Sequence, residues 1–276
     1  MLDNFVYVDH VGRKFSGREH GVYINYNDMR NYEWKYSTIN SRLSRFYTDV
    51  TNRTLPLVLA HKTAEEARTI RHRLFSLTEG DIAAMKPGKI YIGDYYTQGY
   101  ITSSKKSAYL VNDRYCALEL RLTSDDPMWY KERQYVFTPG SNETGGSTSG
   151  ADYPYDYPYD FAVNMNGRSI TNDAITESAF RMTIHGQATN PTITINDHEY
   201  TVNGTVGVGE MLVIDSISKK ITLIDSNGKE TNWFDKRGRD DYIFKPIPAG
   251  SNMVNWIGNF GFNLTVIEKR SEPAWI

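Results

Sequence analysis

The 276-residue sequence predicts a mainly β protein with two domains and a single helix. Two observations support this. Short apolar runs separated by tight-turn residues fill the C-terminal half, and a capped amphipathic helix interrupts strand-like runs in the N-terminal half. A chain of this length can form two cores of ordinary size. We therefore expect an α+β domain at residues 1–136, a flexible connection at 137–152 and a β-sandwich at 153–276.

The helix of the N-terminal domain is predicted from a start signal and a periodicity. Thr63 and Glu66 form a capping box, in which the Thr hydroxyl accepts from a free backbone amide. Apolar residues such as Ile70 then recur at helical spacing. Gly80 is a residue through which the chain can leave the helix in a left-handed conformation. We expect an amphipathic helix over Thr63–Thr78 that lies on a sheet.

The sheet of the same domain is predicted from runs of β-forming residues around the helix. The run Tyr115–Leu122 alternates outward and apolar side chains, which is typical of a half-buried antiparallel strand. The predicted strands are Arg53–Ala60, Lys89–Ile92, Tyr100–Ser103 and Arg114–Leu122.

The connection between the domains has almost nothing to bury. The segment from Thr138 to Gly150 is rich in Gly, Ser and Thr, as in a flexible connection or an exposed loop. A repeated Asp-Tyr-Pro-Tyr unit follows from Asp152 to Asp160, and each Pro holds the Tyr before it extended. This repeat is either an exposed recognition strip or an edge strand packed on the sandwich.

The C-terminal sandwich is predicted from strands that alternate with turn formers. Asn203-Gly204 lies between apolar alternations, and such a pair is the strongest short-range hairpin signal. Asn190-Pro191 and Ser226-Asn227-Gly228 are turns of similar chemistry. The predicted strands are Phe180–His185, Thr192–Ile195, Glu199–Val202, Glu210–Asp215, Lys220–Asp225 and Asn263–Glu268.

Composition argues against several classes of protein. The formal net charge of -2 does not suit a dedicated nucleic-acid binder. The one cysteine, Cys116, lies in a strand-like run, so we expect it to be buried and inert. No stretch approaches the roughly 18 apolar residues of a membrane helix, and no secretory signal is visible at the N-terminus. We expect synthesis in a reducing cytoplasm and no membrane partner.

No motif carries a catalytic, cofactor-binding or metal-binding constellation. The Gly204–Gly209 run lacks the spacing of a phosphate loop and lies between strands. Asp225–Glu230 matches only the start of a calcium loop. His185 and His198 lie in adjacent predicted strands but have no third ligand. We predict no enzyme activity and no cofactor or metal.

Several sequence blocks are specific in their combined order and spacing. They are Leu55–Leu59, the helix from Thr63, Asp126–Tyr130, Gly186–Ile195, Tyr200, Gly209–Asp215, Ile247–Asn252 and Glu268–Trp275. Together these blocks resemble the distal tail protein (Dit) family of long-tailed, non-contractile phages, and the resemblance covers the whole chain.

The resemblance implies an N-terminal belt domain that closes into a homo-hexameric ring and a galectin-like C-terminal sandwich that projects outward. In that family the ring lies at the tail tip. It joins the tail tube protein to the tail-associated hub protein of the baseplate and often docks receptor-binding proteins for host attachment. DNA passes through the lumen without specific binding. The sugar-binding residues of the galectin fold are not visible in Thr189–Thr194 or elsewhere.

We therefore expect a non-enzymatic virion protein at the tail tip, made in the cytoplasm of the bacterial host. A ring needs two different faces on each protomer, and exposed sheet edges can supply them. The expected ring interface consists of Leu55, Leu57, Leu59, Ile70, Arg71 and Tyr91, and the expected docking surface consists of Tyr153, Tyr155, Tyr157, Tyr159 and Trp233.

Two other functions stay open at the level of sequence. A carbohydrate-binding module for host cell-wall polysaccharide would use exposed aromatic residues such as Tyr155, Tyr159, Trp233 or Trp256 as a stacking platform. A glycan-processing enzyme would need two carboxylates across a cleft, which the sequence cannot place. An equivalent role in a phage-tail-like bacteriocin would use the same mechanism as in an infectious phage.

Overall fold

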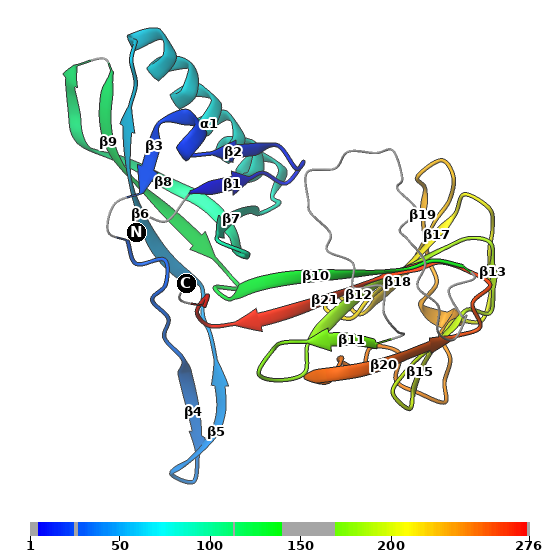
Figure 1. Cartoon of the computed structure of the whole chain (residues 1–276). Coiled ribbons are helices and arrows are strands. Elements are labelled where there is room, and N and C mark those ends of the chain that lie inside the picture. The colour runs from blue at the N-terminus through cyan, green and yellow to red at the C-terminus, as the bar shows by residue number, and fades with distance from the viewer. Residues whose placement is uncertain (1–4, 25–26, 113, 140–168, 275–276) are drawn as a thin grey trace. The chain divides into compact units, whose positions relative to one another are not determined.

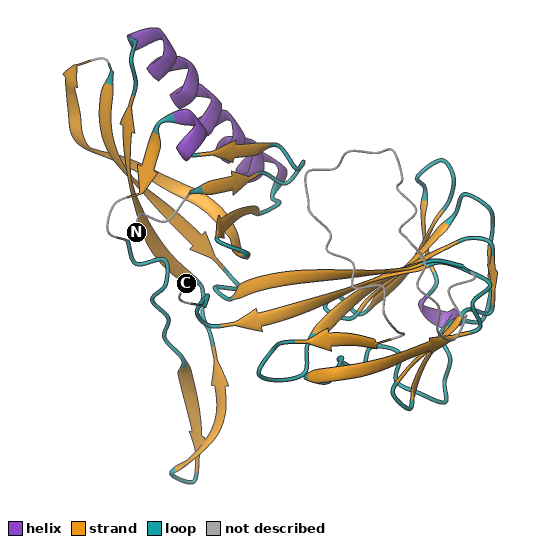
Figure 2. Cartoon of the chain, viewed as in Figure 1, coloured by secondary structure: helices purple, strands orange, loops and turns teal. Residues whose placement is uncertain are grey.

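The computed structural model describes residues 5–24, 27–112, 114–139 and 169–274 (Figure 1). The chain divides into two compact units, Met1–Lys131 with Lys269–Ile276 (unit 1) and Glu132–Glu268 (unit 2). The predicted fold class is confirmed, because the described part is mainly β with one α-helix (Figure 2). The strands β10 (Trp129–Phe137) and β21 (Phe262–Arg270) carry the chain from unit 1 into unit 2 and back.

The strands of unit 1 form two antiparallel groups that share one long strand, β8. One group has the order β10-β8-β7-β1-β2, and the other has the order β3-β6-β9-β8. The bounds are β1 Val6–Val8, β2 Lys14–Ser16, β3 Val22–Ile24, β6 Thr51–Ala60, β7 Gly88–Ile92, β8 Tyr95–Asn112 and β9 Tyr115–Ser124, with a 3-10 turn at Arg18–His20.

The predicted alternation in β6 and β9 is confirmed. Every second residue of both strands is buried, and the two strands pair along their full lengths. Leu57 lies opposite Leu118, and Leu59 lies opposite Cys116, whose thiol is free and buried as expected. One face of the sheet therefore supplies the core of unit 1, where Leu74 and Leu77 of the helix join it.

The helix α1 (Ala64–Ala84) begins as predicted and ends later than predicted. The Thr63 hydroxyl accepts a hydrogen bond from the amide of Glu66 at 3.2 Å. The expected exit near Gly80 is wrong, because the helix continues to Ala84 and ends through Met85 in a left-handed conformation. Contacts of the buried Asp81 hold this last turn, so tertiary structure overrides the weak helix propensity of Gly80.

Unit 2 is a sandwich of two antiparallel sheets with the orders β19-β18-β17-β12-β21-β10 and β11-β20-β14-β15. Both sheets contribute to one core, where the rings of Phe180 and Tyr200 meet edge to face at 5.1 Å. The bounds are β11 Ser169–Asn172, β12 Ala179–His185, β13 Ala188–Thr189, β14 Thr192–Ile195, β15 His198–Thr201, β16 Thr205–Val206, β17 Met211–Asp215, β18 Lys220–Ile224, β19 Glu230–Asn232 and β20 Gly250–Trp256, with a 3-10 turn at Phe234–Lys236.

A hairpin of unit 1 pairs with no other described strand. It consists of β4 (Lys35–Ile39) and β5 (Arg42–Tyr47), and we call residues 35–47 the arm. Asn40 and Ser41 form its two-residue turn, and both have positive φ, as a type I′ hairpin turn requires. Every residue of the arm is exposed. Figure 1 shows it extending from unit 1 on the side away from α1.

Candidate assembly surfaces

The three leucines expected at a ring interface lie in the core of unit 1. Leu55, Leu57 and Leu59 are each at most 1% exposed, so their side chains pack inside their own protomer. A surface that β6 offers to a neighbour must come from its other face, where Pro56 and Val58 are half-buried. The periodicity located this strand correctly, but it could not show which of its two faces meets solvent.

The edge of β6 opposite β9 offers few backbone amides for pairing with another strand. The short strand β3 covers only residues Leu57–Leu59 of that edge. Further along, the amide of Thr54 donates to the carboxylate of Asp28, which points this amide away from β9. Residue 56 points its backbone nitrogen to the same edge, and as a proline it has no N–H to donate. A neighbouring strand would therefore find few donors here.

The other expected interface residues are half-buried. Ile70 packs against the core of unit 1. Arg71 donates from Nε to the carbonyl of Ala67 at 3.1 Å, and Tyr91 packs its ring 5.3 Å from that of Tyr96. Arg71 lies on α1 and Tyr91 on β7, so the structure does not gather these residues with β6 into one continuous exposed patch.

Most of the expected docking surface lies outside the described residues. This is the case for Tyr153, Tyr155, Tyr157 and Tyr159, together with the connection from residue 140 onward. Trp233 is described, and it is only 7% exposed. The ammonium of Lys236 lies 3.6 Å from the centre of its ring, and Gly204 packs so closely that a Cβ there would approach the ring to 2.8 Å. Trp233 therefore serves the sandwich core.

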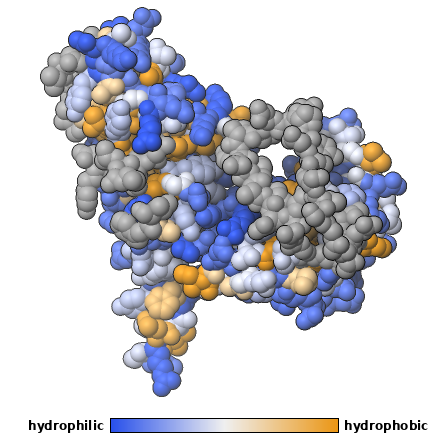
Figure 3. All heavy atoms as spheres, in the orientation of Figure 1, coloured by the Kyte–Doolittle hydropathy of each residue, from blue (hydrophilic) through white to orange (hydrophobic). Residues whose placement is uncertain are grey.

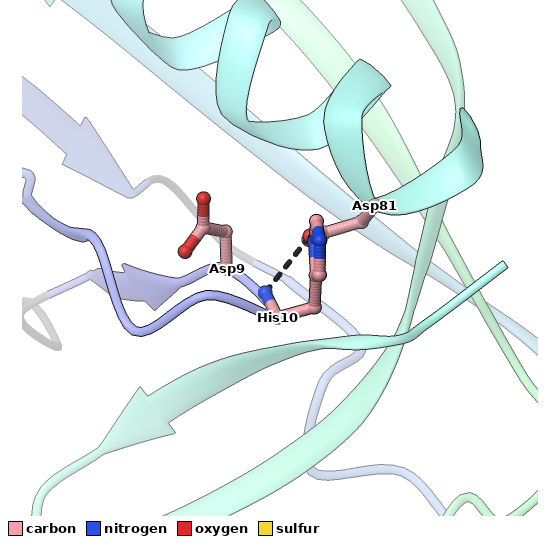
Figure 4. A group of neighbouring side chains, drawn as sticks. All are labelled: Asp9, His10 and Asp81. Carbon is pink, nitrogen blue, oxygen red and sulfur yellow. Dashed lines mark hydrogen bonds and ion pairs between the residues drawn. The ribbon is translucent and has the colours of Figure 1, made fainter. Parts of the chain in front are cut away.

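One cluster in unit 1 combines two buried aspartates with a histidine (Figure 4). Asp9 and His10 follow β1, and Asp81 lies in the last turn of α1. The backbone amide of His10 donates to Asp81 Oδ1 at 2.9 Å, and His10 Nδ1 lies 2.6 Å from the same oxygen. The hydroxyl of Tyr7 donates to Asp81 Oδ2. The cluster thus ties the first strand to the end of the helix.

The second aspartate of this cluster is satisfied by its own loop. Asp9 Oδ1 accepts from the amides of Val11 and Arg13, and Oδ2 accepts from Nε of Arg13 at 2.6 Å. Burial alone would raise the pKa of Asp9, but the bonds from Arg13 outweigh it and hold that pKa below its usual value. Because every carboxylate oxygen of the cluster has a donor, the arrangement fits a structural clamp and not a metal site.

The three motifs that the sequence analysis set aside have local structural roles. Asp225 Oδ1 accepts from the amides of Asn227 and Lys229, so this carboxylate closes a turn. The glycine-rich run contains the short strand β16 and then a turn held by Glu210, whose Oε2 accepts from the amide of Gly207. His185 lies in β12 of one sheet and His198 in β15 of the other, so these residues are not on neighbouring strands.

The arm is a surface that was not predicted from the sequence. Of the twenty large apolar side chains that are exposed in the described part, eight lie between Tyr32 and Val50. Figure 3 shows apolar residues gathered on this projection. The signal was present in the sequence: Asn40-Ser41 separates two runs of β-forming residues, and Asn tolerates positive φ.

The described residues contain no helix with the length and apolarity to cross a membrane.

Comparisons with known proteins identify the fold. No family model matches the chain, and no curated protein matches it by sequence. Among solved structures, a chain from the phage P2 baseplate in its activated conformation with Ca matches with a TM-score of 0.61 at 11% identity, covering 99% of this chain and 100% of that one. The same baseplate with Sr gives 0.60 at 10% identity, with the same coverage.

A third solved structure is that of the SPP1 Dit (gp 19.1) protein, from the hub adsorption apparatus of a phage that infects Gram-positive bacteria. It matches with a TM-score of 0.53 at 11% identity and covers 96% of this chain and 98% of that one. The chain therefore has the fold of phage baseplate and Dit hub proteins over essentially its whole length. The expected Dit-like fold is confirmed.

Proposed function

We propose that this protein is a structural component of the distal end of a phage tail, where six copies form a ring that connects the tail tube to the hub of the baseplate. The observation that supports this best is the fold likeness to a phage baseplate chain and to SPP1 Dit, which extends over both units. The same fold can serve different functions, and the assembled state is the property that distinguishes a ring component from other proteins of this fold.

In this proposal unit 1 builds the ring and unit 2 is the outward docking module. The tail tube protein and the tail-associated hub protein contact the two sides of the ring, and receptor-binding proteins dock on unit 2. DNA passes through the lumen without specific binding. The protein acts in the virion tail tip, and its role is structural and not catalytic.

The carbohydrate-binding alternative loses the described part of its platform. Trp233 lies under Lys236, and Trp256 is 9% exposed and donates from its indole nitrogen to the carbonyl of Phe260 at 3.0 Å. A stacking platform needs an open ring face, which neither residue offers. Tyr155 and Tyr159 lie outside the described residues.

Native mass spectrometry of the full chain, with negative-stain images, tests the proposal. We expect a six-subunit species and rings with a central hole. A chain that stays monomeric at high concentration would contradict the ring. Retention of the same protein on purified cell-wall polysaccharide, measured in parallel, would then move the carbohydrate-binding alternative to first place.

A further inference from the structure

A contact between His20 and Arg73 joins the helix α1 to the segment before β3. Nη1 of Arg73 lies 3.0 Å from Nε2 of His20, which ends the 3-10 turn. The same guanidinium donates to the carbonyl of Lys14 in β2 at 3.3 Å. β2 is the last strand of its sheet, next to β1. Arg73 thus fastens a sheet edge and the turn after it to α1, and we call its contact with His20 the latch.

The latch requires a neutral His20 ring. A guanidinium has N–H donors and no acceptor, so Nε2 of His20 must accept the bond from Arg73. The single ring proton of the neutral imidazole then lies on Nδ1. A proton on Nε2 would remove the hydrogen bond and place two cations in contact. Because histidine ordinarily changes charge between about pH 5 and 8, mild acid opposes the latch.

A second histidine lies on the other side of the turn. His61 follows β6 and packs against Gly21, where a Cβ would approach its Nδ1 to 3.2 Å. Burial lowers the pKa of His61, and the charges of Arg71 and His20 lower it further, against the opposing charge of Glu66. Protonation of either ring therefore adds positive charge to a region that already holds arginines of α1.

The turn and β2 supply little negative charge to offset this. The 3-10 turn contains one exposed residue of each sign, Arg18 and Glu19. In β2 the one charged residue is Lys14, which is exposed. The charged groups that β2, the turn and α1 bring to the latch are thus mainly basic.

The closed latch also leaves two ring nitrogens unsatisfied. Nδ1 of His20 and Nε2 of His61 are buried and have no hydrogen-bond partner among the described residues. A buried polar atom without a partner costs free energy that water recovers when the segment opens. The His20 ring packs on Phe15 with 4.8 Å between ring centres. This packing and the bond from Arg73 are among the interactions that oppose opening.

We propose that the latch is a pH-sensitive switch, which holds β2 and the 3-10 turn on α1 at neutral pH and releases them in mild acid. Release would uncover Phe15, which has no exposure in the closed state, and would free the edge of β1 for other contacts. The switch lies within unit 1 and does not depend on the proposed ring.

The direction of the pH effect follows from proton binding. A closed latch excludes a proton from Nε2 of His20, whereas the open segment can bind one. Acid therefore favours the open segment, and the closed state gains stability as the pH rises. His61 acts in the same direction, because its pKa is lowered in the folded state. Its contribution is present above the unfolded pKa of about 6.5 and is lost as the pH falls through the folded pKa.

Amide hydrogen exchange of the full chain tests the switch. Mass spectrometry of peptides that cover residues 14–22 gives the protection of the segment, after correction for the intrinsic effect of pH on exchange. From about pH 7.5 to 5.5 we expect this protection to fall roughly five- to ten-fold in the wild type. In His20→Gln the fall should be much smaller, because the glutamine oxygen can accept from Arg73 and does not titrate. His72→Gln, at an exposed histidine of α1, is the matched control and should behave as the wild type.

Two variants of Arg73 separate charge from hydrogen bonding. Arg73→Lys keeps a donor and the positive charge, so it should keep the fall in protection. Arg73→Gln keeps a donor without the charge, and its side-chain oxygen can accept from a protonated His20, so its fall should be smaller.

Each outcome supports or overturns the switch. Equal protection of the wild-type segment at both pH values would overturn it, as would an undiminished fall in His20→Gln. Where His20→Gln is unprotected already at neutral pH, the arginine variants decide, and equal falls in both would overturn the proposal. Peptides from β12 of unit 2 should keep their protection throughout, which shows that the change is local.

Discussion

At the scale of single residues, the clamp of Asp81 shows how a buried charge is tolerated. Its carboxylate has no exposure and accepts from Tyr7 and from two nitrogens of His10. Burying a carboxylate is costly unless such donors replace water. The sequence did not predict this site, because Asp81 is far from Tyr7 and His10 along the chain and no short motif joins them.

We expect Asp81→Asn to destabilise unit 1 by about 2–4 kcal/mol, because it removes the charge to which three donors point. Tyr7→Phe removes one donor and leaves the other two, so its cost should be smaller, about 1–2 kcal/mol. Urea denaturation of the full chain, followed at the transition of unit 1, measures both. Equal stability of wild type and Asp81→Asn would refute the clamp.

Asp9 gives the clamp region a dependence on pH. Its pKa is lowered in the folded state, so its contribution to stability is fully present above the unfolded pKa of about 3.9. The contribution is lost as the pH falls from there through the lower folded pKa, because the folded state must then take up a proton. We expect the stability difference between wild type and Asp9→Asn to shrink below about pH 4. A difference that stays constant from pH 7 to pH 3 would contradict this.

At the scale of elements, the sequence predicted the most strongly patterned segments, missed β10 and β20 among others, and found only Tyr100–Ser103 of the longest strand, β8. The alternation of apolar residues was sufficient to predict β6 and β9, because it matches the two-residue period of a strand. The capping box and the helical spacing of apolar residues were sufficient to predict the start of α1. No strand was predicted before Arg53, where β1, β2 and β3 have three residues each. These strands depend on pairing with other strands: β1 pairs with β7 and β2, and β3 pairs with β6. The arm has no buried face, so it carries no apolar alternation.

The end of α1 allows a stabilising substitution. Met85 is 77% exposed and has a φ of 52°, a left-handed conformation that costs a side chain more than it costs glycine. We expect Met85→Gly to stabilise unit 1 by about 0.5–1 kcal/mol relative to Met85→Ala, since glycine suits the residue after a helix. Thermal unfolding of both variants measures the difference. A lower midpoint for the glycine variant would contradict the prediction.

At the scale of the whole molecule, unit 2 is inserted within unit 1. The last residues of the chain return to unit 1, where Ala274 packs against the core and Lys269 pairs with Asp126 at 3.2 Å. From the sequence, all residues from 153 onward were expected in the sandwich, because nothing in the pattern of β21 marks the return of the chain to unit 1.

This insertion predicts how the chain can be divided. A fragment of residues 132–268 contains the complete core of unit 2 and should unfold cooperatively on its own, although the two strands that are cut lose part of their pairing.

A fragment of residues 1–131 lacks the returning segment, so it should be less stable than the same fragment with residues 269–276 joined to it through a short glycine-serine linker. The carbonyl of Pro273, which accepts from Arg30 at 3.4 Å, and the apolar contact of Ala274 are the interactions that the linker would restore. Urea denaturation of the two unit 1 fragments compares them directly. A joined fragment in which Lys269 and Ala274 are replaced by glycine serves as the matched control and should give a smaller gain, since it keeps only the bond from Arg30 to the carbonyl of Pro273. Equal midpoints for all three unit 1 fragments would show that the C-terminal residues only lie on unit 1 and do not complete it.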